Sequence, residues 1–555
     1  MTRPVPTSPS ASAVPPDLHQ LWDAIVVGTG PGGAAAGLAL AEAGKTVLFL
    51  EEGGPSDLRG SYPELLPPRR GAVLGPADAH LLRRAGRYEH LVHDTSGPRP
   101  REFVPFIGAG PGGSSALYGM ALERFLPQDF EPAAQHPGAT VSTQVDAWPI
   151  RYADLAPFYA QAEQRLRVRG EIDPLIAQRG GAAQPAQLLP APALSPHAQA
   201  FSGLMRSQGL HPYRLPAACE ALPGCTSCQG YLCAQPCKND AQRSLLQPAL
   251  QQPGGRYLGG CRVTGMATDG RRVTGVLAQH QGQALRLQAR TVILAAGALQ
   301  TPLILLRSRN TDHPDGLGNR SGWVGRNLMR HFVDLYLVQP DPQLPPIDNR
   351  QKEIAFNDFY LGQDAKLGTV QSFGSLPPPA MLVGSLQDDV RASALSPLAA
   401  ALPWVQPLLA PLLGRMMGGA MILATITEDL PYADNAVRPA SHQGGALNLH
   451  YRLQPEAHRR VALFRKRMRQ VLQGQRWRLL PQADNNQRLA HACGTCRMGD
   501  DAATSVLDRH NRVHGLDNLF VVDSASFPSS GGTNPSLTIM AQALRVGQLL
   551  VQATP

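Results

Sequence analysis

The stretch Asp23-Ala-Ile-Val-Val-Gly-Thr-Gly-Pro-Gly-Gly33 decides the fold. Its apolar start predicts a buried strand of a parallel sheet, where near-continuous apolar runs are usual. Residues from about 33 to 43 are rich in Ala and Leu and predict a helix, which Gly44 would end as its C-cap. Thr46 to Leu50 predicts a second strand. Strand, glycine-rich turn, helix and strand together form one βαβ unit of an α/β fold.

Within this stretch, Gly28, Gly30 and Gly33 fit the dinucleotide fingerprint G-x-G-x-x-G. The glycines permit a tight turn and a close approach of the backbone to a pyrophosphate, to which the helix N-terminus offers free N–H groups. Glu51 ends the second strand, where a carboxylate can accept hydrogen bonds from a ribose diol. A turn that only packs a helix onto a sheet is the alternative, but strand, helix and acid stand in the order that the fingerprint requires. FAD and NAD both fit such a site.

The bulk composition fits a large protein with more than one domain. The chain has 555 residues, of which 43% are hydrophobic and 17% charged, and its net charge is +9. Its arginines are scattered without a long basic run, which indicates a solvated surface rather than a nucleic-acid site. Residues 1–20 predict a flexible tail. Because the sequence shows neither a secretory signal nor a run of about 18 apolar residues, we expect a cytoplasmic protein without a membrane span.

Further elements follow the βαβ unit. They are a turn and amphipathic helix over 148–163, a hairpin around Asp269-Gly270, a buried strand over 291–294, a strand over 446–451, and a strand and helix over 519–523 and 535–551. Residues 165–222 are rich in Pro, Ala and Gln, which indicates irregular structure. Residues 335–480 differ in character and indicate a second domain inserted into the first.

Five ordered motifs carry a resemblance to a known family. They are Gly28 to Gly33 with Glu51-Glu52-Gly53-Gly54, Gly112 to Met120 with Arg124, Trp148-Pro149-Ile150, Ala295 to Pro302, and a C-terminal set of His491 to Gly499, Val522-Asp523 and Asn534 to Thr538. In these motifs the sequence resembles the glucose–methanol–choline (GMC) oxidoreductases over nearly the whole chain beyond the tail. The resemblance implies a flavoenzyme that binds FAD and oxidises an alcohol.

The implied fold is α/β with an α+β substrate domain. A Rossmann-type FAD-binding domain would be interwoven with an antiparallel-sheet substrate domain. We expect the FAD-binding domain over residues 21–150, 225–335 and 485–555. The substrate-binding domain would then span residues 151–224 and 336–484.

The resemblance also implies cofactor contacts beyond the first turn and Glu51. These positions are Gly110, Gly113, Ser114, Ser115, Tyr118, Val263, Ala296, Asp523, Asn534 and Pro535. The 110–118 segment would line the isoalloxazine ring and pyrophosphate, Val263 the adenine, and Asp523 the ribityl–pyrophosphate region. The family often has Asn where Tyr118 stands. Some members attach FAD through a His in the stretch 110–124, and because this chain has none there we expect non-covalent FAD.

His491 occupies the family position for the catalytic base, and Asn534 lies downstream beside the flavin. Flavin oxidation of an alcohol moves a hydride to flavin N5 while the hydroxyl proton leaves, and a base within reach contributes about 10² to 10⁴ in rate. Histidine suits this role because its ordinary pKa lies near neutrality. Asn534 can donate an amide N–H to the same oxygen, and it could also cap the following helix. His331, His442 and His514 lack this context and are interpreted as structural.

Four cysteines crowd into one loop, Cys225-x₂-Cys228-x₄-Cys233-x₃-Cys237. In certain electron-transferring relatives the equivalent region holds an iron–sulfur cluster, which would relay electrons to an external acceptor. The spacing differs from ferredoxin runs, and disulfides or reduced thiols are the other interpretations. Cys493 and Cys496 form a C-x-x-C, which resembles a common form of the family motif rather than a thioredoxin-like pair. No histidine pair or carboxylate cluster predicts a zinc site.

The expected partner is a small-molecule alcohol, either lipophilic or a sugar or polyol. The Pro-interrupted apolar stretch 392–426 could form a lid, contact a membrane surface or pack in the core, whereas Trp148-Pro149-Ile150 resembles sugar-oxidising relatives.

Oxygen, a quinone and a cytochrome are all open as electron acceptors. A lyase or decarboxylase of the same family and a non-catalytic FAD-binding subunit are the other function classes. The family's light-driven decarboxylase lacks the pair that His491 and Asn534 form here, which favours oxidation.

Overall fold

The computed structural model describes most of the chain. It describes residues 16–66, 74–97, 99–137, 139, 147–176, 179, 187–345, 352–362, 364–374, 377–379, 381–383, 390, 409, 411–415, 417, 419–440, 446–487, 489 and 491–553. The predicted tail up to residue 15 and most of the apolar stretch 392–426 lie outside this part. The last residues of that stretch belong to strand β13 (Met421–Thr427). No helix among the described residues is both long and apolar enough to cross a membrane.

A seven-stranded sheet carries the dinucleotide motif. Its parallel strands are β6 (Gly255–Leu258), β2 (Val47–Leu50), β1 (Leu21–Val27), β9 (Gln283–Leu294) and β17 (Leu519–Val521), and its antiparallel additions are β8 (Val273–His280) and β7 (Cys261–Thr268). In β1, Ala24 pairs with Val47 on one side and Thr291 on the other. Ile25 and Val26 are fully buried, as expected for a strand covered on both faces. The predicted βαβ strands and hairpin are confirmed.

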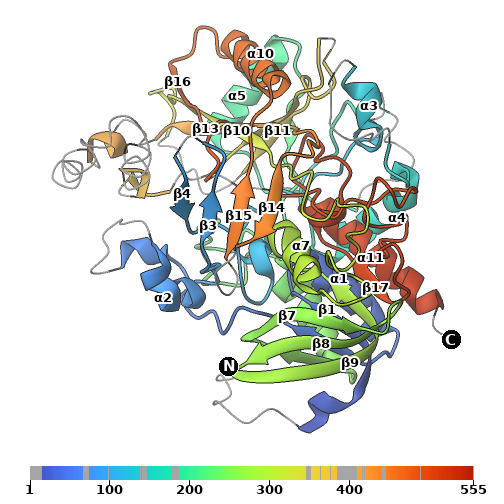
Figure 1. Ribbon diagram of the computed structural model, residues 1–555. Coiled ribbons are helices and arrows are strands. Elements are labelled where there is room, and N and C mark those ends of the chain that lie inside the picture. Colours follow the sequence, from blue (N-terminus) through green and yellow to red (C-terminus); the bar gives the residue numbers. More distant parts are fainter. Residues whose placement is uncertain are drawn as a thin grey trace, which may run out of the picture.

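Two helices pack against each other beside this sheet (Figure 1). They are α1 (Pro31–Glu42), which starts with Pro at its first position, and α11 (Ser536–Ala553). A Cβ on Gly547 would lie 2.7 Å from the Cβ of Ala39, so the missing side chain permits the close approach of α11 to α1. Gly44 has a φ of +78°, which fits its predicted place just after α1.

A six-stranded antiparallel sheet forms the second layer (Figure 1). Its order is β16 (Trp477–Leu480), β10 (Phe332–Val338), β13, β12 (Gly368–Ser372), β11 (Ile354–Phe356) and β5 (Tyr213–Arg214). Helices α5 (Pro196–Ser207) and α10 (Pro455–Val471) cover it. Phe201 of α5 and Phe464 of α10 share one apolar cluster with Tyr336 of β10. The predicted antiparallel-sheet substrate domain is thereby confirmed as a fold.

A third sheet joins distant segments of the chain. It contains β14 (Ala436–Pro439), β15 (Leu447–His450), β3 (Val92–Asp94) and β4 (Arg101–Phe103). β15 pairs in parallel with β3, about 350 residues earlier in the sequence. Parts of the two expected domains therefore share a sheet, and the residue bounds given for those domains stay a prediction.

The prediction of irregular structure over 165–222 is wrong in part. This segment contains α5 and the short strand β5. The Ser195 side chain accepts a hydrogen bond from the Ala198 backbone N–H, and Pro196 follows at the first helical position. Ser-Pro is a helix-start signal that the surrounding Pro- and Gln-rich composition obscures.

We predict that Gly33→Ala and Gly30→Ala affect different properties. A Cβ on Gly33 would lie 2.0 Å from the Gly28 carbonyl oxygen, so Gly33→Ala should destabilise the apoprotein by about 1–3 kcal/mol or more. On Gly30 the nearest heavy atom would be 3.9 Å away, so Gly30→Ala should keep apoprotein stability and lose FAD affinity instead. Urea unfolding and FAD titration measure both. Equal losses of stability in the two variants would contradict the assignment of Gly33 to packing and of Gly30 to FAD binding.

Candidate active site

The dinucleotide turn lies at the carboxyl end of β1, where the chain enters α1. Gly28 adopts a φ of +96°, in the left-handed region that favours glycine. A Cβ on Gly30 would lie 3.9 Å from the Cα of Gly113, which is ordinary van der Waals contact. The structure thus brings the two predicted glycine-rich segments together at the N-terminus of α1. Free N–H groups and the helix dipole favour an anion at such a position.

Glu51 connects these two segments. Its Oε2 accepts from the backbone N–H of Thr29 at 2.9 Å and from the Thr29 hydroxyl at 2.7 Å. Its Oε1 accepts from the backbone N–H groups of Gly53 and Gly110, each at 3.0 Å. Burial raises the pKa of Glu51, although the four hydrogen bonds oppose this shift. Because these donors fill the acceptor positions of a carboxylate, a ribose diol would have to compete with Thr29 for Glu51.

The segment 110–118 is shaped by left-handed glycines and internal hydrogen bonds. Positive φ angles of 128°, 87° and 52° occur at Gly110, Gly112 and Gly113. The Ser114 hydroxyl accepts from the Gly108 N–H at 3.1 Å. The Ser115 hydroxyl donates to the Gly112 carbonyl at 2.6 Å, and the Tyr118 hydroxyl donates to the Asn239 carbonyl at 2.6 Å. Ser115 and Tyr118 therefore use their hydroxyls within the protein.

Asp523 joins the Ala295–Pro302 motif to the C-terminal motifs. Its Oδ2 accepts from the Gly297 N–H at 2.9 Å and from the Thr301 hydroxyl at 2.5 Å. Its Oδ1 accepts from the Ala525 N–H at 2.8 Å and so caps the short helix η9 (Ser524–Ser526). Two further predicted contacts lie on separate elements: Ala296 follows β9 and directly precedes helix α7 (Gly297–Arg307), and Val263 is buried in β7.

His491 is held by a second histidine. Its Nδ1 lies 2.8 Å from the Nδ1 of His331, whose Nε2 lies 2.8 Å from the carbonyl oxygen of Gly531. A carbonyl only accepts, so His331 carries its proton on Nε2 and, when neutral, accepts at Nδ1. His491 must then donate from Nδ1, which leaves a lone pair on its Nε2. This hydrogen-bond chain gives His491 the tautomer of a proton acceptor.

Both imidazoles are neutral near pH 7. Burial lowers the pKa of His331 to about 4. Burial, together with His331 and Lys352, lowers the pKa of His491 well below its ordinary value. His491 also adopts a φ of +65°, an unusual backbone conformation for a residue with a side chain. Such conformations cluster at functional sites, where the surrounding structure maintains them.

Asn534 belongs to the turn 529–534 that precedes α11. It is 8% exposed, and its Oδ1 is buried without a hydrogen-bond partner among the described residues. Buried polar atoms are almost always paired, so an unpaired amide oxygen indicates a place for a ligand. Pro535 follows it directly. The same turn contains Gly531, whose carbonyl contacts His331. Because His331 also contacts His491, it connects the segment of His491 with the turn that carries Asn534.

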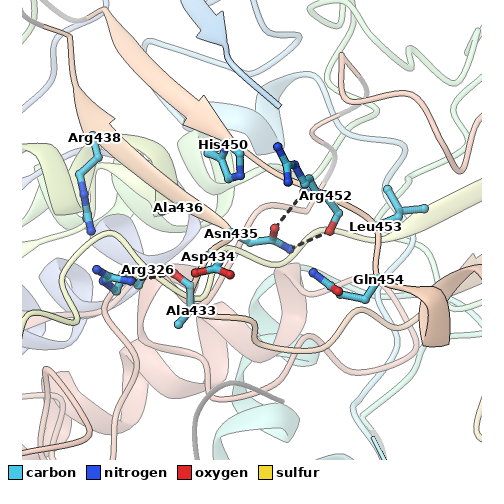
Figure 2. Close-up of a pocket in the computed structure, with 10 residues that line it drawn as sticks. All are labelled: Arg326, Ala433, Asp434, Asn435, Ala436, Arg438, His450, Arg452, Leu453 and Gln454. Carbon is cyan, nitrogen blue, oxygen red and sulfur yellow. Dashed lines mark hydrogen bonds between the residues drawn. The ribbon is translucent and has the colours of Figure 1, made fainter. Parts of the chain in front are cut away.

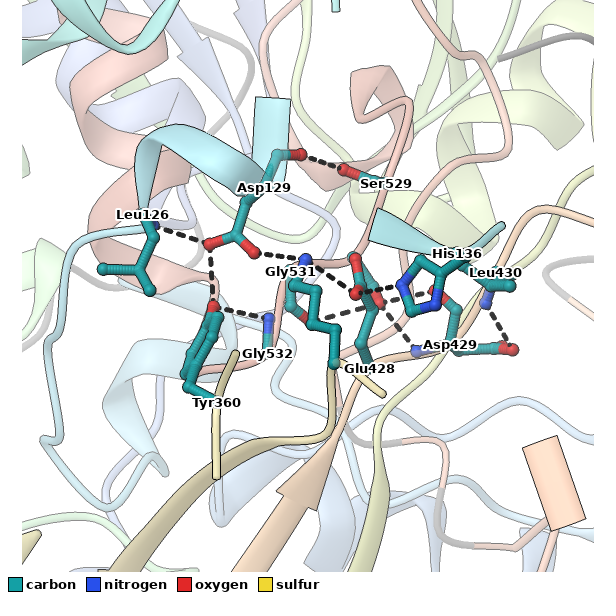
Figure 3. Close-up of polar contacts among 12 residues, drawn as sticks. Leu126, Asp129, His136, Tyr360, Glu428, Asp429, Leu430, Ser529, Gly531 and Gly532 are labelled. Atoms are coloured by element: carbon teal, nitrogen blue, oxygen red, sulfur yellow. Dashed lines mark hydrogen bonds and ion pairs between the residues drawn. The ribbon is translucent and has the colours of Figure 1, made fainter. Parts of the chain in front are cut away.

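A buried ionic cluster lies beneath this turn (Figure 3). It consists of Asp129, His136, Lys366 and Glu428. Lys366 Nζ lies 2.5 Å from Asp129 Oδ1 and 2.7 Å from Glu428 Oε2, and His136 lies 2.8 Å from Glu428. Burial alone would raise the pKa of Glu428, but Lys366 and His136 hold this pKa well below its ordinary range. Lys366 thus supplies a positive charge to both buried carboxylates.

The ionic cluster positions the turn through hydrogen bonds (Figure 3). The Tyr360 hydroxyl donates to Asp129 Oδ2 at 2.7 Å and accepts from the Gly532 N–H at 2.7 Å. The Ser529 hydroxyl donates to the Asp129 carbonyl at 2.7 Å and accepts from the indole N–H of Trp148 at 2.7 Å. The predicted Trp148 motif therefore meets the C-terminal motif at the turn that carries Asn534.

Sequence reasoning misses several of these residues. It interprets His331 as structural, whereas the structure places His331 against His491, 160 positions away in the sequence. Lys366 and Glu428 stand in no motif, and only tertiary structure brings them to Asp129. The Pro-rich composition of 335–480 gives no sign of these charges. Local spacing could not have found any of these pairs.

Comparison with known proteins decides the family. The family models of GMC oxidoreductase match residues 23–333 and 431–543. The chain belongs to the GMC oxidoreductase family. It is 31% identical to 6'''-hydroxyparomomycin C oxidase of Streptomyces lividus, covering 97% of this chain and 92% of that protein. It is 29% identical to paromamine 6'-oxidase of Streptomyces fradiae, covering 95% and 91%. The crystal structure of pyridoxine 4-oxidase from Mesorbium loti matches with a TM-score of 0.61 at 21% identity, covering 95% and 99%.

As a GMC oxidoreductase, the chain is an FAD-dependent enzyme that acts on an alcohol group. Its residues fit this cofactor. The open side of Gly30 lets a pyrophosphate approach the N-terminus of α1, where free backbone N–H groups favour an anion. The unpaired Oδ1 of Asn534 adds a polar group that no described residue satisfies.

The predicted cysteine loop packs against the segment 110–118 and gains a fifth member, Cys219. Lys238 Nζ donates to the Ala116 carbonyl at 2.8 Å and anchors the loop. The sulfurs of Cys219 and Cys225 lie 3.8 Å apart, and those of Cys228 and Cys233 are also hydrogen-bonded. No group of three or more His, Cys, Asp or Glu among the described residues is arranged to hold a metal ion.

Cys493 and Cys496 are fully buried in the C-terminal motif. Burial raises the pKa of each thiol well above its ordinary value, so neither forms a thiolate near pH 7. This environment supports the interpretation of the C-x-x-C as a structural part of the family motif.

A surface pocket of about 530 Å³ lies elsewhere (Figure 2). Arg326, Arg438, Arg452, His450 and Asp434 are among the residues that line it. None of the predicted FAD-contacting or catalytic residues does so. This pocket is therefore separate from the predicted cofactor-contacting and catalytic residues.

Lys366→Met should destabilise the protein by about 3–5 kcal/mol, because it leaves two buried carboxylates without their counter-charge. Lys466→Met, on the exposed face of α10, is the matched control and should change stability little. Urea unfolding of the holoenzyme measures the difference. Equal stability of the two variants would show that the ionic cluster does not support the turn.

Proposed function

We propose that the chain oxidises the CH–OH group of a small-molecule alcohol with His491 as the general base. The observation that carries this proposal is the hydrogen-bond chain from Gly531 through His331 to His491, because it leaves His491 Nε2 as a proton acceptor. FAD, when bound, takes up the hydride of the carbinol carbon at its N5. The protein residues orient the alcohol and move its proton.

In the proposed reaction, Nε2 of His491 accepts the hydroxyl proton. The imidazolium that forms keeps its Nδ1–H directed at Nδ1 of His331, which is neutral because burial lowers its pKa to about 4. Since the pKa of His491 is itself low, the proton transfer needs the departure of the hydride in the same event. The amide of Asn534 would donate an N–H to the oxygen as negative charge develops there.

For the substrate we propose a sugar or polyol rather than a lipophilic alcohol. The two Streptomyces relatives are, by their names, oxidases of aminoglycosides, which are sugar derivatives. The lipophilic alternative rests on the stretch 392–426, which lies mostly outside the described residues. Oxygen is the proposed acceptor, since both relatives are named oxidases. We propose non-covalent FAD because no histidine stands in 110–124.

The other function classes explain fewer features of the site. A non-catalytic FAD-binding subunit has no need of a base held in one tautomer, and a lyase would use such a base but leave the flavin oxidised. Oxidation of an alcohol uses both a base and an amide N–H donor, which are the roles proposed for His491 and Asn534.

We predict that His491→Ala lowers the rate constant of flavin reduction by about 10² to 10⁴, because the proton acceptor is lost. Asn534→Ala should lower it by up to about 10³. Anaerobic stopped-flow mixing with a panel of polyols measures the rate through flavin absorbance. His510→Ala, at an exposed position, is the control and should react like the wild type.

The rate constant of flavin reduction in the wild type should also stay constant from pH 7 down to about pH 6. Because the pKa of His491 is lowered, this histidine is unprotonated over the whole range. A rate that halves near pH 6.5 would contradict the low pKa of His491. Flavin that stays oxidised with every alcohol would contradict the proposed reaction.

For the cysteine loop we propose paired thiols that can form disulfides, and no iron–sulfur cluster. Each pair contains one thiol with a lowered pKa: the hydrogen bond from Cys219 lowers the pKa of Cys225 to about 5, and that from Cys228 lowers the pKa of Cys233 to about 4. A thiolate beside a thiol is the arrangement from which a disulfide forms under oxidation. Cys237 also contacts Cys225.

Anaerobically purified protein should therefore contain no iron or acid-labile sulfide. Thiol titration of the denatured protein should give more free thiols after reduction than after air exposure. Stoichiometric iron and sulfide would overturn the proposal and favour the cluster.

A further inference from the structure

The third sheet has one apolar face and one face that carries cationic side chains. Val437 of β14 and Leu449 of β15 are fully buried in one apolar cluster. Arg438 and His450 directly follow them in their strands, so their side chains point to the opposite face. Both line the surface pocket of about 530 Å³, which therefore lies on the polar face of this sheet (Figure 2).

Three arginines from separate segments line this first pocket (Figure 2). Arg326 precedes β10, Arg438 belongs to β14 and Arg452 follows β15. Each guanidinium donates to a backbone carbonyl: Arg438 to that of Val324 at 2.7 Å, Arg326 to that of Gly322 at 3.1 Å, and Arg452 to that of Ser96 at 3.3 Å. These carbonyls orient the three side chains without neutralising their charge. The Nη2 group of each arginine donates to no described residue.

No carboxylate in the described part of the chain forms an ion pair with these three arginines. Asp434 lines the same pocket but contacts none of their guanidinium groups at ion-pair distance. Exposed arginines elsewhere are paired, as Arg84 is with Asp57 at 2.9 Å and Arg509 with Asp500 at 3.0 Å. The first pocket therefore collects positive charge in a concave surface, where it attracts anions.

A second pocket continues this positive surface. It has a volume of about 360 Å³ and shares Arg438 with the first pocket. Arg309 and Arg320 also line it, and neither forms an ion pair with a described carboxylate. Burial and the charge of Arg326 lower the pKa of Arg438, which agrees with the close approach of like charges here. A bound anion would offset this repulsion.

We propose that the two pockets together bind a small molecule with two linked phosphates, with Arg438 between their two halves. Arginine suits phosphate because its planar guanidinium donates two parallel N–H···O bonds. Five arginines and two aspartates line the two pockets, which gives a net charge of +3 before His450 is counted. A phosphate monoester carries about −1.5 to −2 at pH 7, so two linked phosphates balance this charge better than one.

This site goes beyond the proposed function and does not depend on it. None of the residues predicted to contact FAD or to act in catalysis lines either pocket. Binding of a diphosphate can therefore be measured on the oxidised holoenzyme, without an alcohol and without turnover.

The test titrates four probes into holoenzyme that has been freed of excess FAD. They are inorganic pyrophosphate, ADP, inorganic phosphate and uncharged adenosine. By isothermal titration calorimetry we expect pyrophosphate or ADP to bind once per chain, about tenfold or more tightly than phosphate, and adenosine not to bind. ADP as the tighter diphosphate would indicate a nucleotide ligand, and pyrophosphate as the tighter one would indicate the inorganic ion. Flavin fluorescence, recorded in parallel, should stay constant because the FAD site is separate.

Arg438→Met should weaken binding of the preferred diphosphate by about tenfold or more, because both pockets lose their shared guanidinium. Arg438→Lys should recover only part of the affinity, since an ammonium lacks the planar fork. Arg452→Met should also weaken binding, and because Arg452 is exposed this variant tests the site even if Arg438→Met does not fold. Arg478→Met removes the same charge from an exposed position of β16 outside both pockets, and should bind like the wild type.

Four results would overturn the proposal. Equal losses in Arg478→Met and Arg438→Met would show that the net charge of the protein attracts the anion. Phosphate that binds as tightly as both diphosphates would remove the case for two linked phosphates. A rise of flavin fluorescence would place the probe in the FAD site. A poly-glutamate peptide that binds more tightly than either diphosphate would assign this face to an acidic protein instead.

Discussion

The hydrogen bond from His331 Nε2 to the Gly531 carbonyl is the constraint on which the chemistry of the site depends. A carbonyl cannot donate, so this bond fixes the proton of His331 and, through the contact between the two Nδ1 atoms, the proton of His491. Burial keeps both rings neutral near pH 7. One backbone carbonyl thereby decides which nitrogen of His491 is free to take a proton. Membership of the family shows FAD-dependent oxidation of an alcohol, and this geometry indicates which nitrogen of His491 would accept the proton of the alcohol.

The carbonyl of Gly531 can do this only if its turn is held in place. Every support found here is buried and far away in the sequence: the ionic cluster acts through Asp129 and Tyr360, and Trp148 acts through Ser529. Buried charges add little net stability, but they hold one arrangement against the alternatives.

The dinucleotide half of the fold could be predicted from the sequence because its signals are local. The apolar run of β1, the glycines of the turn and the Ala-rich helix follow one another within 30 residues, and the structure confirms them. His491 and Asn534 were accessible only through the resemblance to a family. His331 and the ionic cluster could not be predicted, since their partners lie more than 60 residues away and no spacing encodes them. Helix α5 was missed because a Ser-Pro start lies within a segment whose composition indicates irregular structure.

The most direct test is a crystal structure of the holoenzyme with a bound, unreactive analogue of a polyol. The geometry predicts that His491 Nε2 and the amide of Asn534 both lie within hydrogen-bond distance of one hydroxyl oxygen at the N5 edge of the flavin, with His331 still between His491 and the Gly531 carbonyl. A structure in which His491 turns its Nδ1 to the ligand, or in which His491 and Asn534 lie on separate sides of the flavin, would contradict the central claim.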